Sequence, residues 1–195
     1  MTPGAFAEAL TATPQQTEGP FYPDKLPLDT DNDLIVINDS ITPAIGEITH
    51  LYGTVRNATG SPVRNAVVEI WQADMDGNYI HSRSRGGGNR DANFQGYGRF
   101  LTGSTGEYFF RCIKPTPYGR RTPHIHVAVN VKGKRVLTTQ CYVRDHELNR
   151  GDRILNNTPA DVRDLLICDF TPIPNSRTGE LTAQFDMVIG ITPED

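Results

Sequence analysis

The sequence lacks several features that would assign it to a large class of proteins. No apolar run is long enough to cross a bilayer. Residues 1–13 contain neither the basic nor the apolar region of a secretion signal, so we expect neither a membrane partner nor a signal peptide. Basic residues are not in excess, because 19 Lys and Arg stand against 23 Asp and Glu, for a net charge of -4. A nucleic-acid-binding protein would need a basic face to neutralise phosphates, so we expect no nucleic acid partner.

Cysteine is also scarce. Cys112, Cys141 and Cys168 are odd in number, and none of them belongs to a CxxC pair of the kind found in metal sites. Two of the three lie in apolar runs that resemble strands. We therefore expect small buried side chains in a reducing compartment, and a cytoplasmic location.

What the chain does contain is typical of one globular domain: 195 residues, of which 37% are hydrophobic and 22% charged. Short alternating or β-branched runs separated by Gly- and Pro-rich links predict strands at 50–55, 66–72, 98–102, 108–113, 125–131, 135–143 and 183–191. Only 159–166 favours a helix, with Thr158 as its N-cap. This pattern predicts an all-β protein, an antiparallel β-sandwich.

Two segments fall outside the strand pattern. Residues 1–47 are rich in Pro, Thr, Asp and Asn, so we expect an extended N-terminal arm before a catalytic sandwich over 48–195. Residues 77–98 are long, polar and rich in Gly, Arg and Asn. A loop of this length within a compact domain is usually functional or mobile.

The sharpest local signal is the pair His124 and His126. Residues two apart on a strand point to the same face, so the two imidazoles project together while Ile125 and Val127 point into apolar packing. Such a pair could grip a metal, or could be two buried histidines with ordinary hydrogen-bond partners. No third His and no Cys lies nearby to indicate zinc or copper.

Two tyrosines could complete a site. Tyr118 lies in a turn shortly before the His pair, and Tyr79 lies where a strand runs into the long loop. A free phenol has a pKa of about 10, so it binds a metal only if a strongly charged cation removes its proton. Fe(III) would do that, whereas a single tyrosine taken alone is more often a packing residue.

Several motifs occur together in a definite order: Trp71-Gln72-Ala73 with Gly77-Asn78-Tyr79, Gly106 to Pro115 with Pro117-Tyr118, and His124-Ile125-His126. In this combination the chain resembles the intradiol ring-cleavage dioxygenases, and among them the protocatechuate 3,4-dioxygenase branch. The resemblance covers about 13–145, including an arm at 13–22 similar to the start of that branch, and more weakly 185–188.

The resemblance implies a mononuclear, non-haem Fe(III) held by two tyrosinates, two histidines and a solvent hydroxide. It makes Tyr118 and His124 the axial ligands, and Tyr79 and His126 the equatorial ones. It also implies a catechol and O2 as substrates, and a muconate-type diacid as product.

Further roles follow from the same resemblance. Tyr118 would double as a base, Arg121 would stabilise charge developing on the substrate ring, and Gln140 would lie in the same pocket. Thr17 and Gly19 would wall the cavity, while Tyr22 and Lys132 are candidates to bind a substrate carboxylate.

The chain departs from the family in the segment between the axial ligands. Family members commonly have a longer stretch there, with an aromatic residue that lies against the substrate, but here only 119–123 intervene. The identity of the catechol therefore stays open. All four ligands occur in one chain, so we expect a homo-oligomer rather than two different subunits.

Two other functions are compatible with parts of the pattern. The segment 53–70 also resembles prealbumin-like modules that serve in adhesion, which need no such ligand set. A zinc or Fe(II) enzyme could instead use the His pair together with a carboxylate.

Overall fold

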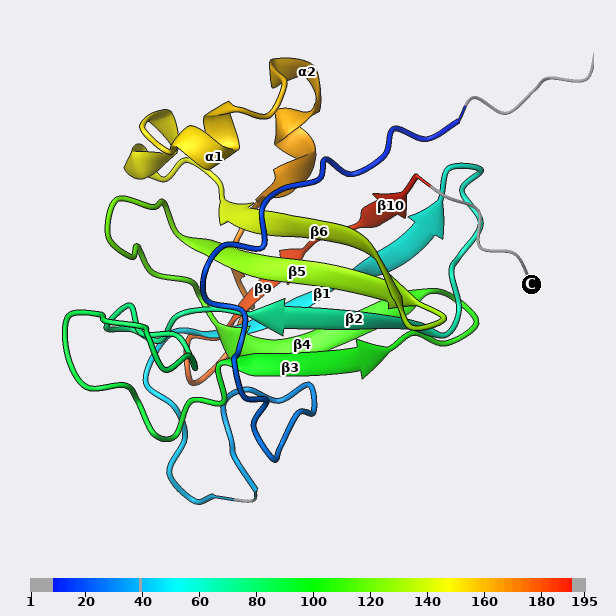
Figure 1. The fold of residues 1–195 in the computed structure, drawn as a ribbon. Coiled ribbons are helices and arrows are strands. Elements are labelled where there is room, and N and C mark those ends of the chain that lie inside the picture. The colour runs from blue at the N-terminus through cyan, green and yellow to red at the C-terminus, as the bar shows by residue number, and fades with distance from the viewer. Residues whose placement is uncertain (1–8, 39, 191–195) are drawn as a thin grey trace, which may run out of the picture.

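The computed structural model describes residues 9–38 and 40–190. Within these residues the strands form two sheets packed face to face (Figure 1). One sheet contains β1 (Ile48–Asn57), β4 (Glu107–Ile113), β8 (Thr171–Pro172), β9 (Leu181–Gln184) and β10 (Met187–Ile189). The other has the order β3 (Tyr97–Leu101), β2 (Ala66–Trp71), β5 (His124–Val131), β6 (Lys134–Val143) and β7 (Ile167–Cys168). The predicted all-β sandwich is confirmed.

The strand pairing is mixed rather than purely antiparallel. β9 and β10 run parallel to β1, and β7 runs parallel to β6. A parallel neighbour needs a long connection that carries the chain back to its starting end. The helical segment between β6 and β7 is such a connection. Sequence periodicity does not distinguish a parallel from an antiparallel neighbour, so this pairing direction was not predicted.

The strand predicted at 183–191 is interrupted, and its last residue lies outside the described residues. Phe185 and Asp186 separate β9 from β10, so the two strands follow one another along β1. The buried Tyr108 hydroxyl donates a hydrogen bond to the Phe185 carbonyl. Gly53 is required opposite this break, because a Cβ there would lie 2.0 Å from the Phe185 oxygen.

The predicted helix at 159–166 is present as α2 (Ala160–Arg163) followed by the 3-10 helix η2 (Asp164–Leu166). The predicted N-cap was wrong: Pro159 occupies that position, and the Thr158 hydroxyl accepts a hydrogen bond from Gln16 Nε2 instead. Two further helices, η1 (Glu147–Arg150) and α1 (Arg153–Asn156), were not predicted, and each is a single short turn. None of the described helices has the length and apolarity to cross a membrane.

The interior between the sheets is apolar, and the three cysteines are buried there without disulfide partners, as expected for their side chains. In β5, Ile125, Val127 and Val129 point into this core. His124 and His126 therefore lie on the outer face of their sheet.

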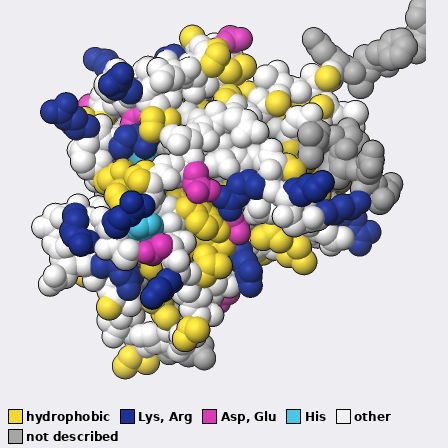
Figure 2. All heavy atoms as spheres, in the orientation of Figure 1, with side chains coloured by type: hydrophobic (Ala, Val, Ile, Leu, Met, Phe, Trp, Pro, Cys, Tyr) yellow, Lys and Arg dark blue, Asp and Glu magenta, His cyan; other side chains and the backbone are white. Residues whose placement is uncertain are grey.

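The arm covers that outer face. Its described residues form no helix or strand and cross β6, β5 and β2 in turn (Figure 1). The Gln16 amide donates to the Thr138 carbonyl in β6, and Tyr22 packs edge-on against Trp71 of β2. Figure 2 shows hydrophobic side chains in the middle of this face with Lys and Arg side chains around them. The arm therefore shields the His pair from solvent.

Candidate metal centre

His124 and His126 are both 3% exposed, and their Nε2 atoms lie 3.2 Å apart. Two nitrogens bound to one metal at about 2.1 Å and at right angles to each other would be about 3.0 Å apart. The Nδ1 atom of His124 lies 2.7 Å from the Thr122 carbonyl, which can only accept, so Nδ1 carries the proton and Nε2 is free to bind. The spacing and tautomer therefore suit a shared metal.

The surroundings keep both imidazoles uncharged. Burial, reinforced by Arg121, lowers the pKa of His124 to about 4. Burial and the neighbouring His124 hold the pKa of His126 well below its usual range. The His126 ring also stacks on Trp71, with centroids 4.8 Å apart and an angle of 6°. A histidine binds a metal in its neutral form, so two neutral imidazoles in fixed positions are ready to act as ligands.

Tyr79 reaches the pair from the turn that follows β2. Its hydroxyl lies 3.4 Å from His124 Nε2, and its ring is 2% exposed. The turn is organised by the buried Asp74 carboxylate, which accepts from the backbone amides of Asp76, Asn78 and Asp91. The same carboxylate thus anchors the backbone just before Tyr79, at Asn78, and the later part of the long loop, at Asp91.

Tyr118 approaches from the link between β4 and β5. A tight turn closed by the Arg121 amide on the Tyr118 carbonyl directs it, and Gly119 supplies the positive φ of 56° that this turn requires. Its ring centroid lies 5.3 Å from that of Tyr79 and 6.3 Å from that of His124. The structure therefore brings together all four side chains that were predicted as ligands.

These donors suit a hard, highly charged cation. Burial raises the pKa of Tyr79 above its ordinary value, and the neighbouring Tyr118 raises it further. Burial also raises the pKa of Tyr118, although Arg121 opposes this. Buried phenols of this kind become ligands only if the metal itself displaces their protons, as Fe(III) can. The residues present thus fit a ferric ion.

The donor set also bears on the alternative of a His pair completed by a carboxylate. Over 9–38 and 40–190, no three His, Cys, Asp or Glu side chains are grouped so that they could hold a metal. The oxygen atom placed next to His124 Nε2 belongs to the Tyr79 phenol. This geometry favours the tyrosine-containing set over a zinc or Fe(II) site.

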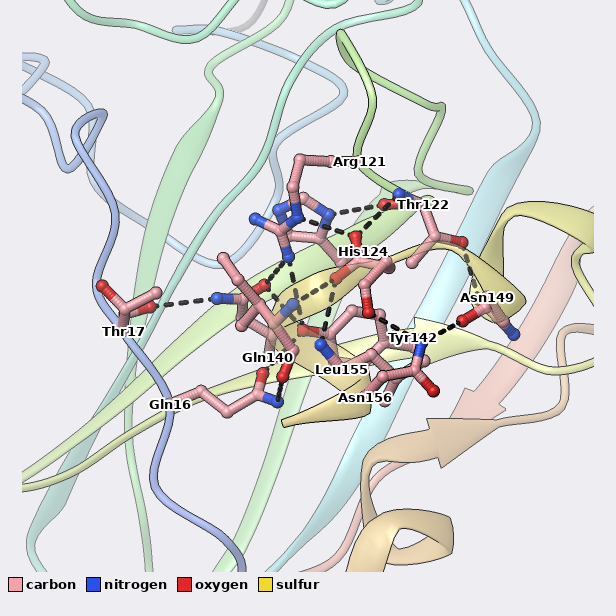
Figure 3. Close-up of polar contacts among 12 residues, drawn as sticks. Gln16, Thr17, Arg121, Thr122, His124, Gln140, Tyr142, Asn149, Leu155 and Asn156 are labelled. Atoms are coloured by element: carbon pink, nitrogen blue, oxygen red, sulfur yellow. Dashed lines mark hydrogen bonds and ion pairs between the residues drawn. The ribbon is translucent and has the colours of Figure 1, made fainter. Parts of the chain in front are cut away.

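Arg121 and Gln140 lie beside the ligands in one hydrogen-bond network (Figure 3). Arg121 Nη2 donates to Gln140 Oε1 at 2.5 Å and to the Tyr142 hydroxyl at 3.3 Å. Arg121 Nε donates to Asp152 Oδ2 at 2.7 Å. The Gln140 amide nitrogen donates to the Thr17 carbonyl at 3.0 Å, which ties the arm to this network.

Of the four residues predicted to contact the substrate, three lie on the same face as the metal centre and one does not. Thr17 and Gly19 lie on the arm beside the centre, and a Cβ at Gly19 would be 3.4 Å from His126 Cε1. Tyr22 lies on the same face, but its ring packs on Trp71 and its hydroxyl donates to Glu69 at 3.4 Å.

Lys132 does not join the other predicted contacts. It occupies the hairpin turn at the opposite end of β5, with a positive φ of 50°. It lies six positions along the chain from His126, roughly 20 Å at about 3.3 Å per residue. Lys132 is therefore beyond reach of the metal centre in its own chain.

Phe21 and Asp152 are among the site residues that the sequence did not indicate. Phe21 stacks on Tyr79, with ring centroids 5.3 Å apart, and meets Tyr118 edge-on at 5.6 Å. The arm has no periodicity from which this packing could be read. Asp152 anchors Arg121, and the one available signal was its N-cap position before α1.

Comparison with known proteins gave one family model and several relatives. The model described as "Dioxygenase" matches residues 17–190. A protocatechuate 3,4-dioxygenase beta chain from Burkholderia cepacia is 36% identical over 154 residues, covering 74% of this chain and 65% of the relative. A hydroxyquinol 1,2-dioxygenase from Rhodococcus opacus is 30% identical over 191 residues, covering 85% and 58% respectively. The chain thus spans about three fifths of the length of these two relatives.

The solved structures agree in fold. The dioxygenase domain of a dioxygenase and carbohydrate-binding protein fusion from Streptomyces sp. SirexAA-E superposes with a TM-score of 0.68 at 26% identity, covering 93% of this chain and 100% of that one. An intradiol ring-cleavage dioxygenase from Tetranychus urticae gives a TM-score of 0.70 at 20% identity, which bears on the fold alone.

Proposed function

The chain belongs to the intradiol ring-cleavage dioxygenase family, and we propose that it opens the ring of a catechol with O2 to give a cis,cis-muconate-type diacid. One observation carries the proposal: the Tyr79 hydroxyl and two neutral imidazoles meet in a buried position, and the half-buried Tyr118 ring lies against them. Tyr79, Tyr118, His124 and His126 would hold a mononuclear, non-haem Fe(III). When bound there, Fe(III) would act as a Lewis acid toward both catechol oxygens and favour the loss of their protons.

The surrounding residues have separable tasks. Tyr118 is only half-buried and stands on a turn, so it has more freedom to move than Tyr79, and we assign it the role of a base that accepts a catechol proton. Arg121 supplies a fixed positive charge toward the ring carbon under attack. Gln140 orients Arg121 through its carbonyl oxygen. Thr17 and Gly19 would wall the cavity, and with Phe21 they would limit the entry of water.

Relatives named for protocatechuate, hydroxyquinol and catechol all match this chain, so a substituted catechol is our proposed substrate class. A carboxylated substrate such as protocatechuate needs a partner for its charge. Tyr22 lies on the correct face. Lys132 could serve only from a neighbouring subunit, as the homo-oligomer that we infer would allow. We also infer a cytoplasmic location.

The test combines colour with oxygen consumption. Phenolate-to-Fe(III) charge transfer should make the purified protein red-brown, and a panel of catechols assayed by oxygen uptake with product identification should give ring-cleaved diacids. If protocatechuate is preferred through its carboxylate, its kcat/KM should exceed that of catechol by at least about tenfold, equivalent to about 1.4 kcal/mol. A colourless protein that consumes no oxygen after loading with iron would overturn the proposal, and would favour a non-catalytic module.

A further inference from the structure

We propose that Asp152 is a positioning residue that fixes the Arg121 guanidinium beside the metal centre, and that α1 serves to hold Asp152 in place. This inference rests on the proposed function. It goes beyond that function by assigning a task to a residue whose hydrogen bonds reach Arg121 and backbone amides but none of the four proposed ligands.

The Asp152 carboxylate is fully buried and uses both of its oxygens. Oδ2 accepts from Arg121 Nε at 2.7 Å and from the Thr122 amide at 3.0 Å. Oδ1 accepts from the amides of Ile154 and Leu155, both at 3.0 Å, and so caps the N-terminus of α1. Four donors converge on one carboxylate, which leaves its side chain a single orientation.

These bonds determine which nitrogen of the Arg121 guanidinium is left to interact with a substrate. Nε is committed to Asp152. Nη2 is committed to Gln140 and Tyr142 (Figure 3). No hydrogen bond between described residues uses Nη1. A guanidinium is planar, so anchoring Nε and Nη2 fixes its plane and presents the remaining nitrogen in one direction.

Without an anchor, the Arg121 side chain could leave the site and extend into solvent. The side chain is 18% exposed, so without Asp152 it could swing outward and recover hydration. Gln140 would not prevent this, because its carbonyl oxygen also lies 3.0 Å from the Tyr142 hydroxyl, which can donate to it instead. Burial opposes ionisation of Asp152, but bonds from the Leu155 amide, Arg121 and the Thr122 amide lower its pKa on balance, so it is an anion when it holds Arg121.

The variant Asp152→Ser separates this task from helix capping. Serine is a good N-cap, so α1 keeps an acceptor, but its short hydroxyl cannot reach Arg121. The matched control is Asp33→Asn. Asp33 also pairs with an arginine, Arg111 at 2.9 Å, and accepts from a backbone amide, that of Ile35, yet it contacts none of the site residues.

We expect Asp152→Ser to lower kcat roughly tenfold, the scale seen when an orienting partner is removed. KM should stay within a factor of two and iron content should match wild type, because the ligands are untouched. Asp33→Asn should leave all three quantities unchanged. In a double-mutant cycle, adding Asp152→Ser to Arg121→Ala should cost no further activity, because the residue that Asp152 positions is already gone.

Three results would overturn the proposal. They are full kcat in Asp152→Ser, a loss of iron equal to the loss of activity, or multiplicative effects in the cycle. If the serine variant does not fold, Asp152→Asn, which can still cap α1, takes its place in the same cycle. A wild-type protein that binds iron but cleaves no catechol would count against the function instead. A crystal structure of the serine variant would then decide the positioning role, with Arg121 displaced from Gln140 if it is correct.

Discussion

At the scale of single residues, each metal-binding atom is aimed by a neighbour that does not bind. The Thr122 carbonyl sets the tautomer of His124, Trp71 supports the ring of His126, and Asp74 organises the turn that ends in Tyr79. Partners of this kind are as important to a metal site as the ligands, because they determine direction.

Removing either histidine should empty the centre. We expect His124→Ala and His126→Ala to contain less than about a tenth of the wild-type iron and to show no ring cleavage, since loss of even an orienting partner costs 10- to 100-fold in affinity. Metal analysis of the purified proteins measures this directly. His50→Ala is the control, because His50 lies on the other sheet and pairs with Glu180. Normal iron in both site variants would end the ligand assignment.

Tyr118 should matter more for turnover than for holding the metal. We expect Tyr118→Phe to keep appreciable iron, to shift the visible band, and to lose activity on the order of 100-fold, the usual contribution of a general base. Tyr52→Phe on the other sheet, where Tyr52 is 40% exposed, is the control for removal of a phenol. An unchanged visible spectrum in Tyr118→Phe would show that this phenol does not bind the metal.

At the scale of elements, one arginine links the arm to two strands of the sheet beneath it. Arg135 of β6 forms ion pairs with Glu18 of the arm and with Glu69 of β2, the latter at 2.5 Å. Its guanidinium also lies 4.8 Å from the centre of the Tyr22 ring. These contacts bracket Gly19 and Phe21, the arm residues nearest the ligands, so Arg135 is well placed to keep the arm closed.

Arg135→Ala should loosen the arm without unfolding the sandwich. We expect faster hydrogen exchange at arm amides such as that of Gln16, with an unfolding free energy lowered by no more than about 1 kcal/mol, as for other partly exposed ion pairs. Exchange measured by mass spectrometry resolves the arm from the sheets.

Arg144→Ala provides a matched control for the arm. Arg144 also bridges two carboxylates, those of Asp164 and Asp169, neither of which belongs to the arm. Equal exchange at the arm in wild type and Arg135→Ala would show that other contacts close it.

At the scale of the whole molecule, the centre joins parts of the chain that lie far apart in the sequence. The turn after β2, the turn before β5 and β5 itself each contribute ligands, and Phe21 brings in the arm. A metal that binds only the folded chain must stabilise it.

Removal of iron should therefore lower Tm. At a free iron concentration of 100 times Kd the stabilisation is about 2.7 kcal/mol, a difference that calorimetry detects readily. Chelator treatment of wild type should reduce Tm, and restoring iron should recover it. His126→Ala should show the same Tm with and without chelator. A wild-type Tm that does not respond to iron would mean that the folded chain does not bind it.

By itself the sequence determined the features that depend on neighbours in the chain. Alternation in 125–131 predicted both the buried face and the joint projection of His124 and His126, because strand geometry makes residues two apart share a face. The same periodicity predicted the sandwich class and the helix at 159–166, and the order of motifs pointed to Tyr79 and Tyr118 as ligands.

Only the tertiary structure decided what depends on packing between distant segments. It brought Tyr79 within 3.4 Å of His124, laid Phe21 and Gly19 over the centre, and joined Asp152 to Arg121. Such contacts join residues tens of positions apart, and they follow from how the sheets, turns and arm pack against one another. Local periodicity carries no information about that packing, since each segment could form the same strand or turn with its partners arranged differently.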